Sequence, residues 1–79
     1  MREVDVIDRK MLREHLAMAD RHVGEGERNL SEQRALVAEL QRDGHDAWLA
    51  SKILRQFEAL QAAFIEDCDR LRKELAQLG

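Results

Sequence analysis

Two long apolar stripes, one on each side of Gly44, constrain the fold of this 79-residue chain more than any other feature. In both stripes the positions recur at alternating steps of three and four, which keeps side chains on one face of an α-helix. The first stripe contains Leu12, Leu16, Ala19, Val23, Gly26, Leu30, Gln33, Val37 and Leu40. The second contains Ala50, Ile53, Phe57, Leu60, Phe64, Cys68, Leu71, Leu75 and Leu78. Such a pair predicts an antiparallel helical hairpin.

Composition supports an all-α fold in one domain over residues 1–79. Proline is absent, aromatic residues make up 4%, and charged residues make up 37%. Ala, Leu, Glu, Arg and Gln dominate, and these residues favour helix. Antiparallel pairing of the stripes predicts the neighbours Leu40 and Ala50, Val37 and Ile53, Leu30 and Leu60, Gly26 and Phe64, Ala19 and Leu71, and Leu12 and Leu78.

Capping residues predict where the helices begin and end. Asp5 suits an N-cap, and Gly44 suits the left-handed position that follows a helix C-terminus. Asp46 is placed to cap a second helix by accepting from the amide of Trp48 or Leu49. The expected elements are a first helix over about 5–43, a turn at 44–45 and a second helix over about 46–77.

The glycine pair Gly24 and Gly26 raises an alternative. Each glycine costs a helix about 1 kcal/mol relative to alanine, and Ser31 could cap a new helix after a break there. That break would give a three-helix bundle. The apolar phase nevertheless continues through Val23, Gly26 and Leu30, which favours one continuous helix.

Apolar residues beside the two stripes predict self-association. Two helices alone cannot surround a core, and chains of this size rarely stabilise one without a partner, a metal or disulfides. A homodimer of two hairpins would form a four-helix bundle, with a different protein partner as the alternative. The additional apolar residues are Val4, Ile7, Met11, Met18, Leu36, Leu49, Leu54 and Ile65. The predicted oligomer interface comprises Leu30, Leu36, Val37, Ile53, Leu54, Phe57, Leu60, Phe64 and Ile65.

Polar residues lie in or beside the same stripes. His15, His22 and Asn29 recur every seven residues along one edge of the first helix. Polar groups at such an interface fix register and oligomeric state, and Gln33 and Gln61 fit the same interpretation. The alternative for His15 and His22 is a pH switch, because a buried imidazole that gains charge would loosen the assembly.

A metal-binding bundle is a further alternative. His22 and Cys68 fall in one layer of the predicted pairing, and Asp67 and Asp69 flank the thiol. Zinc accepts such ligands. However, His15 and His22 are seven residues apart, whereas two imidazoles on one helix bind one ion at a spacing of three or four. A cysteine on an apolar stripe is typical of a small core residue, so we expect no cofactor.

Charge argues against a general nucleic-acid surface. The net charge is −3 and the isoelectric point about 5.6, whereas phosphate binding needs a clustered excess of Lys and Arg. The alternative of an RNA- or DNA-binding dimer rests on a few basic residues near the turn. These residues are Arg34, Arg42, Lys52 and Arg55.

Other function classes lack their signatures. We expect no enzyme, because no nucleophile elbow, phosphate-cradling glycine loop or zinc-protease motif occurs. The sequence has no long apolar run, no apolar core after the charged residues 1–5, and no second cysteine. We therefore expect a cytoplasmic protein. Trp48 is expected to cover the turn, or else to anchor a partner.

Part of the sequence resembles a pattern that recurs in short uncharacterised bacterial helical-hairpin proteins. The resemblance lies in residues 22–28, Gln33 and residues 39–46. That resemblance covers most of the chain and implies a fold without an activity. In architecture the chain is also similar to a small plasmid-encoded RNA-binding hairpin dimer that regulates copy number, and this likeness implies the fold alone.

Overall fold

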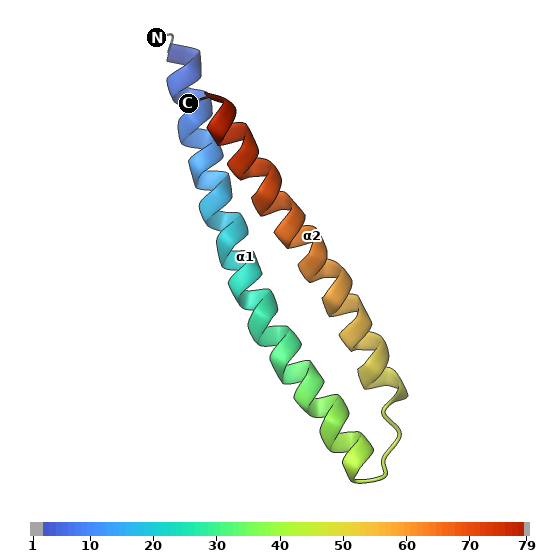
Figure 1. The fold of residues 1–79 in the computed structure, drawn as a ribbon. Coiled ribbons are helices and arrows are strands. Elements are labelled where there is room, and N and C mark those ends of the chain that lie inside the picture. Colours follow the sequence, from blue (N-terminus) through green and yellow to red (C-terminus); the bar gives the residue numbers. More distant parts are fainter. Residues whose placement is uncertain (1–2, 79) are drawn as a thin grey trace.

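The chain folds into two antiparallel helices that lie side by side along a rod (Figure 1). The computed structural model describes the backbone of residues 3–78 and the side chains of residues 8–78. Helix α1 spans Glu3–Arg42 and helix α2 spans Trp48–Leu78. The rod measures 63 × 14 × 14 Å, so it is a single pair of helices thick. The predicted all-α hairpin is confirmed.

Helix α1 is continuous through Gly24 and Gly26, so the three-helix alternative is wrong. It begins at Glu3, and Asp5 therefore lies within the first turns and is not the N-cap that the sequence predicts. The side chains of Val4 and Ile7 lie outside the described residues.

The end of α1 is a Schellman motif, as the glycine predicts. Gly44 has a φ of 75°, which is the left-handed conformation that glycine adopts without a steric penalty. Its N–H donates to the Gln41 carbonyl at 3.2 Å, and the His45 N–H donates to the Leu40 carbonyl at 2.8 Å. These two bonds satisfy carbonyls that would otherwise lack a partner at the end of the helix.

Asp46 caps the second helix from just outside it. Its Oδ1 accepts from the Trp48 N–H at 2.9 Å, as predicted. The Ser51 N–H donates to the Ala47 carbonyl at 2.8 Å. Helix α2 therefore begins at Trp48, two residues later than predicted, because Asp46 holds the preceding backbone in a turn.

The two helices meet along one line, which we call the seam. On both sides of the seam the contacting positions are spaced alternately three and four residues apart, without a break. On α1 the seam positions are the predicted stripe from Leu12 to Leu40, and all of them are buried or half-buried. Ala47, just before α2, begins the second set of such positions. On α2 the buried or half-buried positions that continue the alternation are Ala50, Leu54, Phe57, Gln61, Phe64, Cys68, Leu71, Leu75 and Leu78.

The predicted stripe of α2 is wrong at two positions, because Leu54 and Gln61 occupy the seam places that the sequence predicts for Ile53 and Leu60. Leu60 is 51% exposed, whereas Gln61 is 5% exposed and occupies the seam. The reason is helical phase. After Phe64 the seam continues at Cys68, Leu71 and Leu75, at steps of four, three and four residues. The step before Phe64 must therefore be three residues, which places Gln61 in the seam instead of Leu60. Consequently Gln61, and not Phe64, lies nearest to Gly26, and the predicted pairing of Leu30 with Leu60 is wrong.

The core along this seam is thin. Among the described residues, no large side chain is fully buried. Phe57 and Phe64 are half-buried, so truncating either to alanine is expected to cost less than the 3–5 kcal/mol typical of a fully buried aromatic ring. The buried apolar residues are Ala19, Leu30, Ala47, Ala50, Cys68 and Leu71.

The two helical glycines are expected to respond oppositely to alanine. A Cβ at Gly24 would meet nothing within 4 Å, so Gly24→Ala should raise the free energy of unfolding by about 1 kcal/mol through helix propensity. A Cβ at Gly26 would overlap the side-chain amide of Gln61. Gly26→Ala should therefore be less stable than Gly24→Ala by about 1–2 kcal/mol in urea denaturation, through the displaced hydrogen bond of Gln61.

Pairing each glycine variant with Gln61→Ala provides the control. In that background the overlap is gone, and alanine should stabilise both positions to a similar degree. If Gly26→Ala were as favourable as Gly24→Ala in the chain with Gln61 intact, the close approach of Gln61 to α1 would be wrong.

Candidate interaction surface

Two glutamines cross the seam in opposite directions. Gln33 Nε2 on α1 donates to the Ala50 carbonyl of α2 at 2.9 Å. Gln61 Nε2 on α2 donates to the Val23 carbonyl of α1 at 3.0 Å. A helix carbonyl has a second lone pair, so it can accept such a bond besides its own helical one. Both glutamines thus hold the register of the hairpin itself, since each bond forms at one helical phase only.

Gln61 carries a penalty in this position. Its Oε1 is buried and has no hydrogen-bond partner among the described residues, which costs a buried polar group about 1–3 kcal/mol. Gly26 leaves the space into which this amide fits. The small hollow beside it is lined by Gly26, Asn29, Phe57, Leu60, Gln61 and Phe64.

Charged residues link the helices on one side of the seam. Arg72 of α2 pairs with Asp20 of α1 at 2.9 Å, and Arg34 of α1 lies 3.8 Å from Glu58 of α2. Ile65 is seven residues from both Glu58 and Arg72, so it shares this side. We call this side, defined by these five residues, the ion-pair flank. Its pairs are exposed, so each contributes at most about 1 kcal/mol.

Cys68 is buried at the edge of the same flank. It is 3% exposed, and its Sγ donates to Asp20 Oδ1 at 3.4 Å. Burial raises the pKa of the Cys68 thiol, and the hydrogen bond and charge of Asp20 raise it further, with a smaller rise from Asp69. Arg72 acts in the opposite direction. A thiol that stays protonated is a poor nucleophile and a poor metal ligand.

The structure keeps the two metal-ligand candidates in separate environments. The His22 ring lies against the Phe64 ring, with centroids 5.0 Å apart, whereas Cys68 bonds to Asp20. Over the described part of the chain, no group of three or more His, Cys, Asp or Glu residues could hold a metal ion. The pairing of His22 with Cys68 at one metal therefore has no geometric support.

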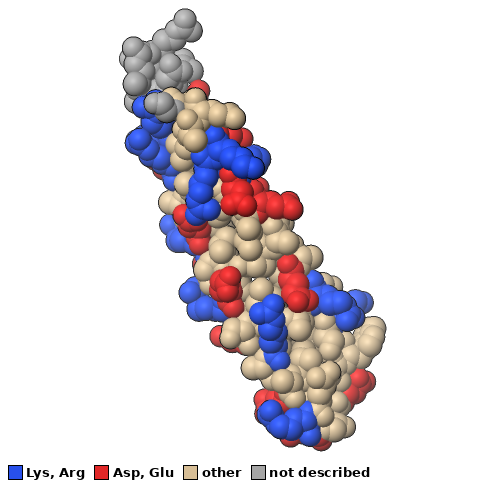
Figure 2. Space-filling model, viewed as in Figure 1, with Lys and Arg blue, Asp and Glu red and all other residues tan. Residues whose placement is uncertain are grey.

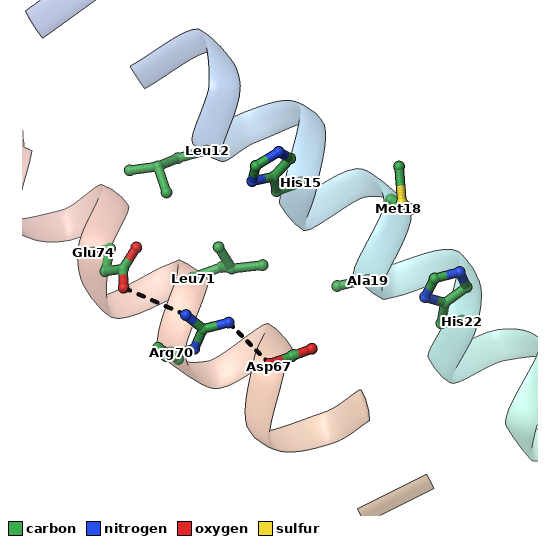
Figure 3. Close-up of a pocket in the computed structure, with 9 residues that line it drawn as sticks. All are labelled: Leu12, His15, Met18, Ala19, His22, Asp67, Arg70, Leu71 and Glu74. Carbon is green, nitrogen blue, oxygen red and sulfur yellow. Dashed lines mark hydrogen bonds and ion pairs between the residues drawn. The ribbon is translucent and has the colours of Figure 1, made fainter. Parts of the chain in front are cut away.

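The other side of the seam carries most of the exposed apolar surface, together with Asp67, Arg70 and Glu74 of α2, which pair with one another. Among the described residues, five of the seven exposed large apolar side chains belong to it, and Ile53 is half-buried beside them. We call this side the apolar flank; its exposed members are Met11, Met18, Leu36, Leu49 and Leu60. A groove of about 290 Å³ at its open end is lined by Leu12, His15, Met18, Ala19, His22, Asp67, Arg70, Leu71 and Glu74 (Figure 3).

Helical spacing places the remaining members on this flank. Met11 and His15 line a second groove of about 340 Å³ with Glu74. Leu36 follows Asn29, and Ile53 precedes Leu60, by seven residues in each case, and Asn29 and Leu60 line one hollow. Leu49 lies one helical turn before Ile53. The predicted edge of His15, His22 and Asn29 therefore belongs to the apolar flank, and the pH switch stays a prediction.

The predicted interface residues divide into three groups. Leu36, Ile53 and Leu60 lie on the apolar flank, whereas Ile65 lies on the ion-pair flank. Leu54 and Ile65, which the sequence analysis counts among the apolar residues beside the stripes, thus lie in the seam and on the ion-pair flank, and the oligomer interface stays a prediction. The members that lie in the seam within the hairpin are Leu30, Val37, Leu54, Phe57 and Phe64.

Two of the four basic residues near the turn already interact with other side chains of the hairpin. Arg34 lies beside Glu58, and the Lys52 ammonium lies 5.3 Å from the centroid of the Trp48 ring. Trp48 is 63% exposed, so it does not cover the turn as predicted. Figure 2 shows basic and acidic side chains interspersed along the side of the rod that it displays, without a region of one sign.

Comparison with known protein families, curated proteins and solved structures found no match for this chain. Within the described residues, neither helix is long and apolar enough to cross a membrane.

Removing the charge of Asp20 and removing the charge of Arg72 are expected to move the pKa of the Cys68 thiol in opposite directions. Asp20→Asn should lower the pKa of Cys68 toward its ordinary value, because the carboxylate that opposes the thiolate is gone. Arg72→Gln should raise this pKa, because the favourable guanidinium is removed. The pH dependence of the alkylation rate with iodoacetamide measures both. Shifts of the same sign in the two variants would contradict this arrangement.

The same thiol makes stability depend on pH. Because folding raises the pKa of Cys68, its contribution to stability is fully present below the pKa of the unfolded chain, about 8.5. That contribution is lost as the pH rises toward the higher folded value. Urea midpoints measured across this window should fall more steeply for the natural chain than for Cys68→Ala. Parallel curves would show that the thiol is not protected.

Proposed function

We propose that this chain is a non-enzymatic interaction module that binds a second copy of itself along the apolar flank and so forms a four-helix bundle. The observation that carries the proposal is the asymmetry of the two flanks. Of the seven large apolar side chains that are exposed in the described part of the chain, five share one flank, whereas the interhelical ion pairs described there occupy the other. Burying apolar surface stabilises an assembly, whereas burying paired charges generally does not.

The exposed area supports a partner of this size. The hairpin exposes 6065 Å². A compact monomer of 9.2 kDa exposes about 4,900 Å² by the usual scaling of area with mass. The difference, about 1,100 Å², is comparable with the roughly 800 Å² per partner that a standard protein–protein interface buries.

A second copy is the occupant that the shape of the surface favours. The apolar flank extends from Met11 near the open end to Leu49 near the turn, so two rods can pack along most of their length. A two-fold dimer uses the same surface on both subunits, which a self-complementary apolar flank satisfies. The pairing would add a second layer to the thin core of a single hairpin.

Two variants matched in exposure test this proposal. Leu36 and Ile65 are each 43% exposed, on opposite flanks. Leu36→Glu should weaken self-association by at least about tenfold, because an unpaired carboxylate would be buried in an apolar interface. Ile65→Glu should leave self-association unchanged, because its flank stays in water. Light scattering on a sizing column over a concentration series measures the mass of each.

Leu60→Glu, at a position 51% exposed, provides a second variant on the apolar flank and should behave as Leu36→Glu does. Circular dichroism confirms that each variant keeps its helices. A natural chain that remains monomeric throughout the concentration series would refute the proposal. A loss of mass with Ile65→Glu and none with Leu36→Glu would place the interface on the opposite flank.

A further inference from the structure

We infer that Met11, His15, Met18 and His22 form a binding site for a soft monovalent metal ion such as Cu(I). The four residues follow one another at steps of four, three and four along α1. This spacing keeps them on one side of the helix over about three turns. Methionine and histidine alternate along this line, so every histidine has a methionine one turn before it.

The structure leaves Met11, His15 and Met18 exposed, and it holds His22 half-buried against Phe64. Met11 is 48% exposed and Met18 is 46% exposed. Met11 and His15 line one groove, and His15, Met18 and His22 line the adjoining one. In Figure 3 the side chains of His15, Met18 and His22 extend from successive turns of α1. Exposed side chains of this kind can rotate to place a thioether and an imidazole around one ion without moving the backbone.

The two donor types together select the metal. A thioether is a soft ligand that favours Cu(I), and an imidazole also suits copper. Residues one helical turn apart have Cβ atoms about 5–6 Å apart, within reach of a shared ion. Met11 with His15, and Met18 with His22, therefore provide two such pairs. His15 and His22 are seven residues apart, which disfavours a site that needs two imidazoles on one ion.

The surrounding charge favours a cation. Asp8, Asp67 and Glu74 contribute carboxylates to the two grooves, and Arg70 contributes the one basic group among their lining residues. The Arg70 guanidinium is already paired with both neighbours on its own helix, at 2.9 Å from Asp67 and 3.8 Å from Glu74. A positive ion bound beside His15 or His22 therefore enters a region of net negative charge.

Cys68 is the competing soft ligand in the chain, and the structure separates it from this line. Its thiol is 3% exposed and bonded to Asp20, on the side of the seam where Arg72 also pairs with Asp20. The inferred site does not require the dimer, because all four ligands lie on one helix of one chain. It therefore goes beyond the proposed function.

The test is a titration of the full chain with Ag(I), which has the charge and softness of Cu(I) and does not oxidise in air. Methyl resonances of carbon-13-labelled methionine and the imidazole resonances of histidine report binding. The chain has three of each residue type, so Met1 and His45 are internal controls. We expect shifts at Met11, Met18, His15 and His22 that saturate at no more than two ions per chain, before any shift at Met1 or His45.

Replacing both thioethers by a similar apolar group isolates their contribution. Met11→Leu with Met18→Leu preserves volume and helix propensity, so helicity should not change. The affinity for Ag(I) should fall by at least about tenfold. The matched control, Cys68→Ala, should bind Ag(I) as the natural chain does.

Three results would overturn the inference. One is a set of shifts that begins equally at Met1 and His45. Another is unchanged affinity in the double leucine variant. The third is loss of binding in Cys68→Ala, which would assign the metal to the thiol. A change of mass in the metal-free double leucine variant would instead bear on the proposed self-association, so the two proposals are tested by separate readouts.

Discussion

The single seam between α1 and α2 is the constraint on which the rest of the structure depends. Two helices meet along one line, so every residue lies in that line, on one of two flanks, or on an outer surface. Such a line buries few large side chains, and the buried apolar residues here are mostly small. A chain that has this many apolar residues and only one seam must leave some of them exposed. The helical phase decides on which flank the exposed apolar residues lie.

Gln61 shows how phase overrides hydrophobicity. In isolation Leu60 would gain more than Gln61 from burial, yet only Gln61 continues the alternation that the seam follows through Phe64 and Cys68. Gly26 provides the space and Val23 provides the acceptor for its amide. The polar residue that enters the seam thereby moves Leu60 outward onto the apolar flank. A local choice of register in the middle of the rod thus contributes directly to the surface that we propose for binding.

The sequence predicts the stripe of α1 in full because no second apolar alternation of three and four residues competes with it there. It predicts the cap at Gly44 because only a left-handed residue ends a helix in that way. The stripe of α2 is ambiguous: Ala50, Phe57 and Phe64 belong to two alternations, one through Ile53 and Leu60 and one through Leu54 and Gln61. Hydropathy favours the first, and only packing against α1 selects the second. The contrast between the flanks could not be predicted, since it depends on which alternation is used.

The proposed self-association surface and the inferred metal site overlap on the apolar flank, so self-association and metal binding are linked. Met18 is an exposed member of the flank and also an inferred metal ligand. A cation held beside Met18 would have to lose part of its hydration if a second hairpin covered that end of the rod. Linkage is reciprocal, so a metal that weakens association is itself bound more weakly by the associated form. The turn end of the flank, around Leu36 and Leu60, has no such ligands, so its contribution to association should be insensitive to metal.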